Sequence, residues 1–342
     1  MLTLLIGATG LLGANLAHLL CKRGDRVRAL VRGASDRRGL RGLPLEEVEG
    51  DVLDPPSLDR AMAGVGRAYH CAGVVRFDAG SAELVRRVNV DGTRNVVEAA
   101  RRSGVARVLC VSSAAAVRQG SLSEPGTEER MPEGPPRSPY HESKVAGEAA
   151  AREAGAGRVE VVTANPSLLL GAYDARPSTG ALLLAVARGV IAGYPAGGTN
   201  AVNAQDAALG LSLVMERGRP GERYLLGGEN LTFKELLTVA AEEAGVAPPR
   251  VPVPDLALAV AEKVAAAAFS LPGLRGLDPG AGALRGLAHP SYVSSMKATR
   301  ELGYRPRTVR LGIRDALRWF QEEGMLPRDV PLAPRGVLAR EW

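Results

Sequence analysis

The stretch Gly7-Ala8-Thr9-Gly10-Leu11-Leu12-Gly13 decides the fold of this 342-residue chain. It follows an apolar run over 2–6 that we expect to form a strand, and it opens a helix predicted over 11–23. The first glycine permits a tight turn, the second lets the backbone approach a pyrophosphate, and the third allows helix and sheet to pack closely. Because 41 residues of the chain are glycine, the spacing alone is weak evidence. Its place between the first strand and the first helix predicts a dinucleotide site.

Short β-type runs alternate with longer helical ones as far as residue 165. Further strands are predicted over 26–32, 46–49, 67–71, 107–112 and 158–164, and helices over 57–63, 81–103 and 139–154. This alternation builds βαβ units with right-handed crossovers and a parallel sheet that is buried on both faces. We therefore predict an α/β fold: a Rossmann-type doubly wound parallel sheet with a smaller C-terminal substrate lobe.

The regular alternation of predicted strands and helices ends after Pro166, where proline and glycine interrupt the chain more often. The predicted organisation is a dinucleotide-binding Rossmann domain over 1–165 that the chain re-enters at about 200–226, a substrate-binding lobe over 166–199 and 227–325, and a tail over 326–342. Helices of the second half are predicted over 232–244, 254–269 and 311–323.

The composition excludes several classes of protein. With 46% hydrophobic and 23% charged residues, the chain has the make-up of a globular protein, and bulk disorder is excluded. The net charge is +6, but the basic residues are scattered and aromatic residues reach only 4%, which disfavours nucleic-acid binding. The N-terminal segment lacks the features of a signal peptide, and no apolar run is long enough to span a membrane. We expect a cytoplasmic protein that acts on a small molecule.

The cysteines and histidines carry no metal-binding pattern. Cys21, Cys71 and Cys110 lie in apolar runs without paired spacing, so we predict three free thiols. The four histidines are far apart in the sequence, and no metal is expected.

The end of the second predicted strand indicates which dinucleotide binds. An NAD enzyme usually places a carboxylate there for the ribose 2′-hydroxyl, whereas this chain has Arg32, followed by Arg37 and Arg38. A 2′-phosphate suits Arg32, with Arg37 or Arg38 assisting through bidentate contacts. NADP(H) is therefore favoured, and NAD(H) stays open. After the third strand, the carboxylate of Asp51 could accept the adenine amino group while Val52 packs on the ring.

Two further features point to acid–base chemistry. Tyr140 and Lys144 lie one helical turn apart on one face of a predicted helix. Because an ammonium favours the phenolate, we expect a lowered pKa for Tyr140 and an acid/base role near neutral pH. Ser113, with Ser112 as the second choice, comes at the carboxyl end of the strand over 107–112, where ligands bind in an open α/β sheet. A hydroxyl there can donate a hydrogen bond to a substrate oxygen.

Together these features resemble the extended short-chain dehydrogenases/reductases, the NAD-dependent epimerase/dehydratase family, over residues 1 to about 325. The motifs that carry the resemblance occur in the expected order: the glycine-rich turn, Asp51-Val52, His70-Cys71-Ala72-Gly73, Asn89, Ser112-Ser113 and Tyr140 with Lys144. Within the family, three stretches are most similar to hopanoid-associated sugar epimerases and dihydroflavonol reductase-like proteins: Asn165–Gly180, Gly221–Leu237 and Ala298–Arg307.

The resemblance implies a catalytic triad of Ser113, Tyr140 and Lys144, with Asn89 as a supporting polar residue. It also implies a dinucleotide site formed by Gly7, Thr9, Gly10, Leu11, Leu12, Gly13, Arg32, Asp51, Val52, Cys71, Ala72, Gly73, Tyr140, Lys144, Asn165, Pro166 and Ser167. A homodimer through the helices over 81–103 and 139–154 is common in the superfamily.

The chain departs from its relatives at two places. Relatives often have a His-Val-Asp-Asp-like run near the domain junction, whereas here the run over 202–206 retains only Asp206. Sugar epimerases of the UDP-galactose type have a hydroxyl one residue after Ser113, and this chain has Ala114 there.

Three functions fit this pattern. The first is an NADP(H)-dependent oxidoreductase that acts on a carbinol or carbonyl carbon, as dihydroflavonol reductases do. The alternative is a sugar or nucleotide-sugar epimerase or dehydratase that retains NAD(P). The third is a non-catalytic dinucleotide-sensing protein, which the intact pair of Tyr140 and Lys144 disfavours because a sensor needs neither.

Overall fold

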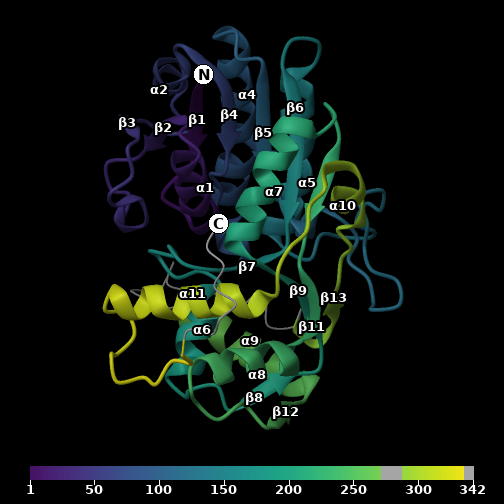
Figure 1. Ribbon diagram of the computed structural model, residues 1–342. Coiled ribbons are helices and arrows are strands. Elements are labelled where there is room, and N and C mark those ends of the chain that lie inside the picture. Colours follow the sequence, from purple (N-terminus) through teal and green to yellow (C-terminus); the bar gives the residue numbers. More distant parts are fainter. Residues whose placement is uncertain (271–286, 335–342) are drawn as a thin grey trace.

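The computed structural model describes residues 1–270 and 287–334 of the chain. Seven strands of this part form the central sheet: β1 (Leu2–Ile6), β2 (Arg26–Val31), β3 (Glu46–Glu49), β4 (Val65–His70), β5 (Arg107–Val111), β6 (Glu160–Pro166) and β10 (Arg223–Leu226). Their order is β3-β2-β1-β4-β5-β6-β10, and all neighbours are parallel (Figure 1). The order reverses at β1, which is the doubly wound arrangement of a Rossmann-type sheet. The predicted fold class is confirmed.

Helices cover both faces of the sheet. On one face lie α1 (Leu11–Lys22) and α7 (Ala204–Arg217), which pack against each other. On the other face lie α2 (Pro55–Met62), α4 (Gly92–Arg102) and α5 (Pro139–Gly155). Each crossover helix therefore returns the chain to the start of the next parallel strand.

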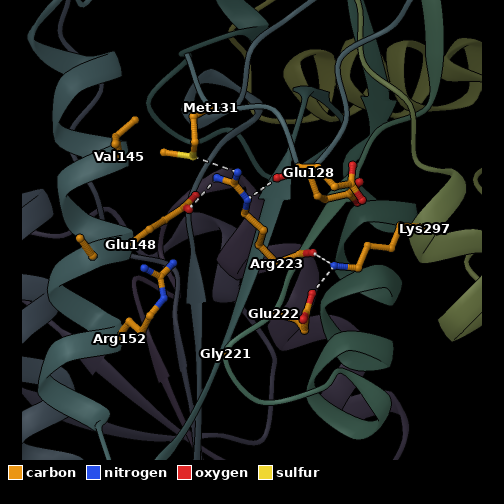
Figure 2. Close-up of a pocket in the computed structure, with 11 residues that line it drawn as sticks. Glu128, Met131, Val145, Glu148, Arg152, Gly221, Glu222, Arg223 and Lys297 are labelled. Atoms are coloured by element: carbon orange, nitrogen blue, oxygen red, sulfur yellow. Dashed lines mark hydrogen bonds and ion pairs between the residues drawn. The ribbon is translucent and has the colours of Figure 1, made fainter. Parts of the chain in front are cut away.

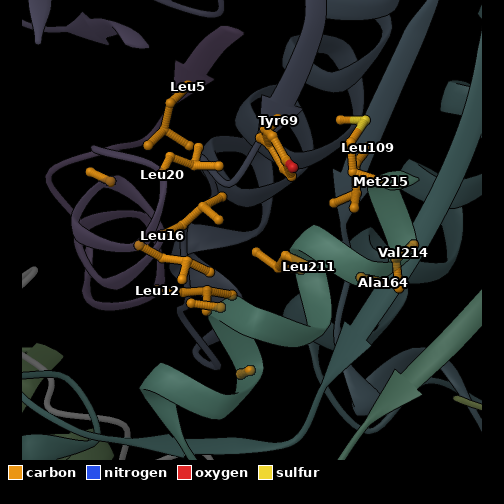
Figure 3. Packing of buried hydrophobic residues seen from close by; sticks show 14 of the residues in the cluster. Leu5, Leu12, Leu16, Leu20, Tyr69, Leu109, Ala164, Leu211, Val214 and Met215 are labelled. Carbon is orange, nitrogen blue, oxygen red and sulfur yellow. The ribbon is translucent and has the colours of Figure 1, made fainter. Parts of the chain in front are cut away.

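Side chains of β1 divide between two hydrophobic cores. Leu5 packs with Leu16 of α1 and Leu211 of α7, as Figure 3 shows. Leu4 and Ile6 belong to the core on the opposite face, with residues of α2 and α4. Successive strand residues point to opposite faces, so a strand covered on both sides must be apolar throughout. This explains the continuous apolar run before the glycine-rich turn.

The helix predicted over 81–103 is interrupted in the structure. A short 3₁₀ turn (Ala79–Ser81) and α3 (Ala82–Arg86) lead into a π-helical turn (Arg87–Asp91), after which α4 begins. Single π turns inside helices are often found at functional sites. This one carries Asn89.

The chain returns to the central sheet late in the sequence. After β9 (Gly198–Asn203), α7 crosses one face and β10 pairs in parallel with β6 as the seventh strand. At this junction the buried carboxylate of Asp206 accepts hydrogen bonds from the backbone N–H of Arg307 at 2.7 Å and from its Nε at 2.8 Å. Asp206, the one residue that fits the relatives' junction motif, thus ties α7 to the chain that enters the last helix.

The smaller lobe combines short strands with helices (Figure 1). Its strands and helices are β7 (Leu168–Leu170), β8 (Gly193–Pro195), β9, β11 (Glu229–Thr232), β12 (Val251–Val253), β13 (Pro290–Ser291), α6 (Gly180–Ala187), α8 (Phe233–Glu243), α9 (Asp255–Ser270) and α11 (Val309–Glu322). A further helix, α10 (Met296–Leu302), packs against α7 and β10. The lobe has its own core, with Leu183 of α6, Leu236 of α8 and Phe320 of α11 fully buried.

The expectation for the cysteines is confirmed in the described residues. Cys21, Cys71 and Cys110 are free thiols, as predicted. Within residues 1–270 and 287–334, no helix is both long enough and apolar enough to cross a membrane.

Candidate active site

The glycine-rich turn lies between β1 and α1, at the carboxyl edge of the sheet. Gly7 has φ of +84°, and a Cβ there would lie 2.5 Å from the backbone nitrogen of Ala72. A Cβ on Gly13 would lie 2.1 Å from the Gly7 carbonyl oxygen. Gly10 is different, since the nearest atom to a Cβ there is 3.6 Å away. Packing therefore requires Gly7 and Gly13, whereas the open side of Gly10 leaves room for a phosphate to approach.

The start of α1 is suited to an anion. Gly10 is its N-cap residue and provides no side-chain cap, and the first N–H groups of a helix have no partner within it. The side chains of Leu11 and Leu12 are buried in the protein. Any contact of these two residues with a dinucleotide would thus come from their backbone. Thr9 lies in the same turn and is half-buried.

The residues predicted to bind the adenosine are Arg32, Asp51 and Val52. Arg32 is exposed at the end of β2, and its guanidinium has no hydrogen bond or ion pair with any described residue. Val52 is buried, while Oδ1 of Asp51 accepts a hydrogen bond from the backbone N–H of Leu53 at 2.9 Å. The three residues follow β2 and β3, two neighbouring strands that end at the same edge of the sheet.

The other two predicted arginines are already paired. Arg37 Nε lies 2.8 Å from a carboxylate oxygen of Glu47. Arg38 forms a bidentate pair with Asp36, which lowers the pKa of that carboxyl to about 2. Among the three arginines of this loop, Arg32 is the one whose guanidinium faces solvent without a partner in the described chain.

The three predicted catalytic residues come together from two elements. Ser113 follows β5 and precedes a 3₁₀ turn (Ala114–Ala116), whereas Tyr140 and Lys144 lie on the first turns of α5. Tyr140 is hydrogen-bonded to the Ser113 hydroxyl, and Nζ of Lys144 lies 5.8 Å from the centre of the Tyr140 ring. Lys144 Nζ also donates a hydrogen bond to the carbonyl of Val111 at 3.3 Å. An acid, a hydroxyl donor and a cation thus share one site at the carboxyl end of β5.

The predicted lowering of the Tyr140 pKa is wrong for this structure. Burial raises its pKa, and the hydrogen bond with Ser113 offsets only part of that effect. The reason is the position of Lys144, whose ammonium donates to Val111 and lies over the ring. Burial also lowers the pKa of Lys144, to about 8, against the opposing effect of Glu148. At neutral pH the pair is therefore a neutral phenol and an ammonium.

The loop after β4 completes the edge of the site. Cys71 continues the pairing with β1, and Ala72 packs against Gly7. A Cβ on Gly73 would lie 3.2 Å from Asn89 Oδ1 and 3.3 Å from Lys144 Nζ. Asn89 accepts a hydrogen bond from the Val74 N–H at 2.8 Å and donates to the Val74 carbonyl at 2.9 Å.

Comparison with known proteins agrees with this geometry. The model of the NAD dependent epimerase/dehydratase family matches residues 3–227. The chain belongs to this family. It is 34% identical to sterol demethylase protein B of Methylococcus capsulatus (95% of this chain, 100% of that protein) and 32% identical to a putative dihydroflavonol 4-reductase of Synechocystis (93% and 94%). The crystal structure of a nucleoside-diphosphate-sugar epimerase from Pseudomonas aeruginosa has a TM-score of 0.78 at 28% identity and covers 95% of this chain and 99% of that one.

Membership of the NAD dependent epimerase/dehydratase family confirms the resemblance to extended short-chain dehydrogenases/reductases. The chain is an NAD(P)-dependent enzyme of the oxidoreductase and epimerase type, with relatives that include dihydroflavonol reductase-like proteins. The third hypothesis, a sensor without catalysis, is set aside. The described residues contain no group of three or more His, Cys, Asp or Glu that could hold a metal ion.

The family's dinucleotide fits the polar groups at the end of β6. Asn165 is fully buried, and its Oδ1 has no partner within the described chain. The hydroxyl of Ser167, two residues later, is buried and equally without a partner there. Buried polar atoms are costly when unpaired, so a ligand with hydrogen-bonding groups at this place would stabilise the site. Pro166, between them, is buried.

One residue of the site was not predicted from the sequence. Glu148 lies on α5 one turn after Lys144, and its Oε1 accepts a hydrogen bond from Asn165 Nδ2 at 2.6 Å. The same Asn165 Nδ2 donates to the carbonyl of Ser113 at 3.0 Å. The signal was present as the continued spacing of four residues from Tyr140 through Lys144 to Glu148.

Proposed function

We propose that this enzyme uses NADP(H), in preference to NAD(H), to interconvert a carbonyl and a carbinol carbon of a small-molecule substrate. The observation that carries the proposal is the meeting of Ser113, Tyr140 and Lys144 at the carboxyl end of β5, on the edge of the sheet that also carries the glycine-rich turn. Ligands of doubly wound sheets bind at this edge. The proposal takes Ser113 over Ser112, because Ser113 is the serine that is hydrogen-bonded to Tyr140.

The chain's own residues would divide the work of binding and proton transfer. The bound dinucleotide supplies or accepts the hydride. The glycine-rich turn and the start of α1 would hold its pyrophosphate, with Asp51 and Val52 at the adenine, and residues 71–73 and 165–167 would line the rest of the site. Lys144 would hold the nicotinamide ribose.

In the reduction direction, Tyr140 would give its proton to the oxygen that becomes the alcohol, while Ser113 donates a hydrogen bond to the same oxygen. In oxidation the proton returns to Tyr140. Because Tyr140 is a neutral phenol at neutral pH, the site as described is prepared for proton donation.

NADP(H) preference rests on the end of β2. Arg32 is exposed there without a partner in the described chain, and β2 ends without a carboxylate. A planar guanidinium binds a phosphate group through paired hydrogen bonds, whereas a ribose 2′-hydroxyl calls for an acceptor. NAD(H) is the alternative cofactor.

The proposal is tested with a panel of carbonyl compounds. The names of the relatives point to sterol ketones and flavonoid ketones as the first members, with NADPH and NADH offered separately and their absorbance followed. We expect NADPH consumption with at least one ketone and release of the corresponding alcohol. Failure of every compound, together with failure to bind either dinucleotide in a fluorescence titration, would contradict the proposal.

The reduction rate is expected to fall in alkaline solution. The folded-state pKa of Lys144 is lowered to about 8, so its ammonium is fully present below that value and is lost as the pH rises through it. If the charge on Lys144 is required, kcat for reduction stays level near pH 6–7 and decreases above about pH 8. Measuring kcat at saturating substrate and cofactor checks this, and a rate that keeps rising to pH 9 speaks against a role for the charge.

A second function is favoured by the similarity to the nucleoside-diphosphate-sugar epimerase. An epimerase must retain its cofactor, since loss after the oxidation step would strand a keto intermediate, whereas a reductase exchanges it in every turnover. We expect the purified protein to lose its dinucleotide on exhaustive desalting. Near-stoichiometric NAD or NADP after that treatment would favour epimerisation instead.

The homodimer and the cytoplasmic location stay predictions. The segments that the resemblance assigns to a dimer interface, 81–103 and 139–154, correspond to α3, the π turn and α4 in the first case and to α5 in the second, and both α3 and α4 pack against α5. Native mass spectrometry of the purified protein measures the oligomeric state directly.

A further inference from the structure

Glu148 is a buried carboxylate in the wall of the site, and its side chain is only 5% exposed. It lies on the same face of α5 as Tyr140 and Lys144, two turns after the first and one turn after the second. Burying a carboxylate is costly unless it is paired and hydrogen-bonded, so its partners show what holds it there.

Both oxygens of Glu148 have partners from distant parts of the chain. Oε1 accepts the 2.6 Å hydrogen bond from Asn165 at the end of β6, and Oε2 lies 3.2 Å from Nη1 of Arg223 at the start of β10. Figure 2 shows the Arg223 guanidinium reaching toward Glu148 from β10. Arg223 also donates to the Glu128 carbonyl at 2.8 Å. The carboxylate is thus fixed between α5 and two adjacent strands of the sheet.

Through Asn165, the same carboxylate reaches the catalytic loop. Asn165 Nδ2 donates to the Ser113 carbonyl as well as to Glu148. If residue 148 had a shorter side chain or no hydrogen-bond acceptor, the buried Nδ2 group of Asn165 would keep only one of its two partners. The backbone that presents the Ser113 hydroxyl to Tyr140 would then lose part of its support.

From this geometry we infer that Glu148 is a positioning residue with two tasks: it places a negative charge one helical turn from Lys144, and its contact with Asn165 fixes the backbone of Ser113. The inference rests on the proposed function only for its effect on catalysis. Its effect on Lys144 exists with or without a substrate.

The other titratable groups around Lys144 carry no negative charge near pH 7. Among the groups that face the ammonium in the described chain, the thiols of Cys71 and Cys110 have pKa values raised to about 12 by burial, so they are neutral near pH 7. The imidazole of His70 is also neutral, since burial lowers its pKa to about 3.

On α5 itself, the neighbouring Tyr140 stays a neutral phenol. Glu148 is thus the negative charge that opposes the desolvation of Lys144 in this part of the protein.

The composition of the chain makes a direct test possible. It contains five lysines, so a spectrum of the protein labelled with ¹³C at the lysine ε-carbons has few signals, and a Lys144→Arg variant assigns the one of interest. In Glu148→Gln we expect the pKa of Lys144 to fall by about one unit or more, because the Glu148 carboxylate raises this pKa in the wild type and a nearby opposite charge shifts a pKa by about 1–3 units. Glu142→Gln, an exposed position on the same helix, should leave it unchanged.

A double variant keeps the test valid if Glu148→Gln alone does not fold. Glu148→Gln leaves the half-buried Arg223 without its carboxylate partner, whereas Glu148→Gln with Arg223→Gln removes both charges. The double variant should lower the pKa of Lys144 by a similar amount, because Arg223 is not among the charges that shift it. A Lys144 pKa within about 0.3 units of wild type in either folded variant would overturn the electrostatic task.

Glu148→Asp separates the second task from the first. It keeps the charge and withdraws the carboxylate by one methylene from Asn165. We expect a Lys144 pKa close to wild type, a several-fold lower kcat on the ketone found in the panel, and an unchanged KM for NADPH. An unchanged kcat would overturn the positioning of Ser113. Absence of any ketone substrate for the wild type would count against the proposed function, and the lysine titration would then decide the electrostatic task of Glu148 by itself.

Discussion

Tyr140→Phe is expected to reduce turnover by about 10²- to 10⁴-fold, the range that a positioned general acid contributes. The substitution removes the hydroxyl that is hydrogen-bonded to Ser113. It keeps the ring, which packs edge-to-face against Phe77 with the ring centres 5.5 Å apart. Single-turnover reduction with NADPH and the ketone identified in the panel measures the chemical step.

The loss of turnover should come from a slower chemical step, and the binding of NADPH should not change. We expect the variant to bind NADPH within a few-fold of wild type and to have the same melting temperature within error. Tyr304→Phe is the matched control, because Tyr304 lies in the buried core on the α1 and α7 face of the sheet, and its hydroxyl has no partner in the described chain. Turnover of Tyr140→Phe within threefold of wild type would remove Tyr140 from the acid/base role.

Local patterns in the sequence predicted the elements that carry the chemistry. A tight turn, a helix start and a spacing of four residues are each properties of a few neighbouring residues, and all three appear as expected at 7–13 and at Tyr140 with Lys144. Six strands were predicted before residue 165, and each matches an observed strand to within two residues at either end. These features need no knowledge of distant contacts.

What the sequence did not predict depends on contacts between distant residues. Glu148 meets Arg223 across 75 positions of sequence, and the spacing of Glu148 from Lys144 does not reveal this partner. The pKa of Tyr140 depends on where the Lys144 side chain is directed, and a shared helix face does not determine that direction. In the π turn, the Asn89 side chain likewise exchanges two hydrogen bonds with the backbone of Val74, fifteen residues earlier in the chain.

The role of Arg32 was predicted from the sequence in part, and a binding measurement can decide it. The sequence predicted three arginines near the expected 2′-phosphate. In the structure two of them form ion pairs and one does not. Arg37 and Arg38 are bound to Glu47 and Asp36, and a phosphate would have to compete with those carboxylates for them. Arg32 has no such competitor in the described chain.

Arg32→Ala is therefore expected to weaken NADPH binding by about 10- to 150-fold, since a hydrogen bond to a charged group contributes about 1.5–3 kcal/mol. NADH has a hydroxyl in place of the 2′-phosphate, so its affinity should change less than threefold. Fluorescence titration of both dinucleotides gives the two ratios. Arg37→Ala is the matched control: because its guanidinium is engaged by Glu47, it should alter NADPH affinity by far less than Arg32→Ala. Equal losses for NADPH and NADH in Arg32→Ala would mean that this arginine does not bind the 2′-phosphate, and the preference for NADP(H) would then lose its support.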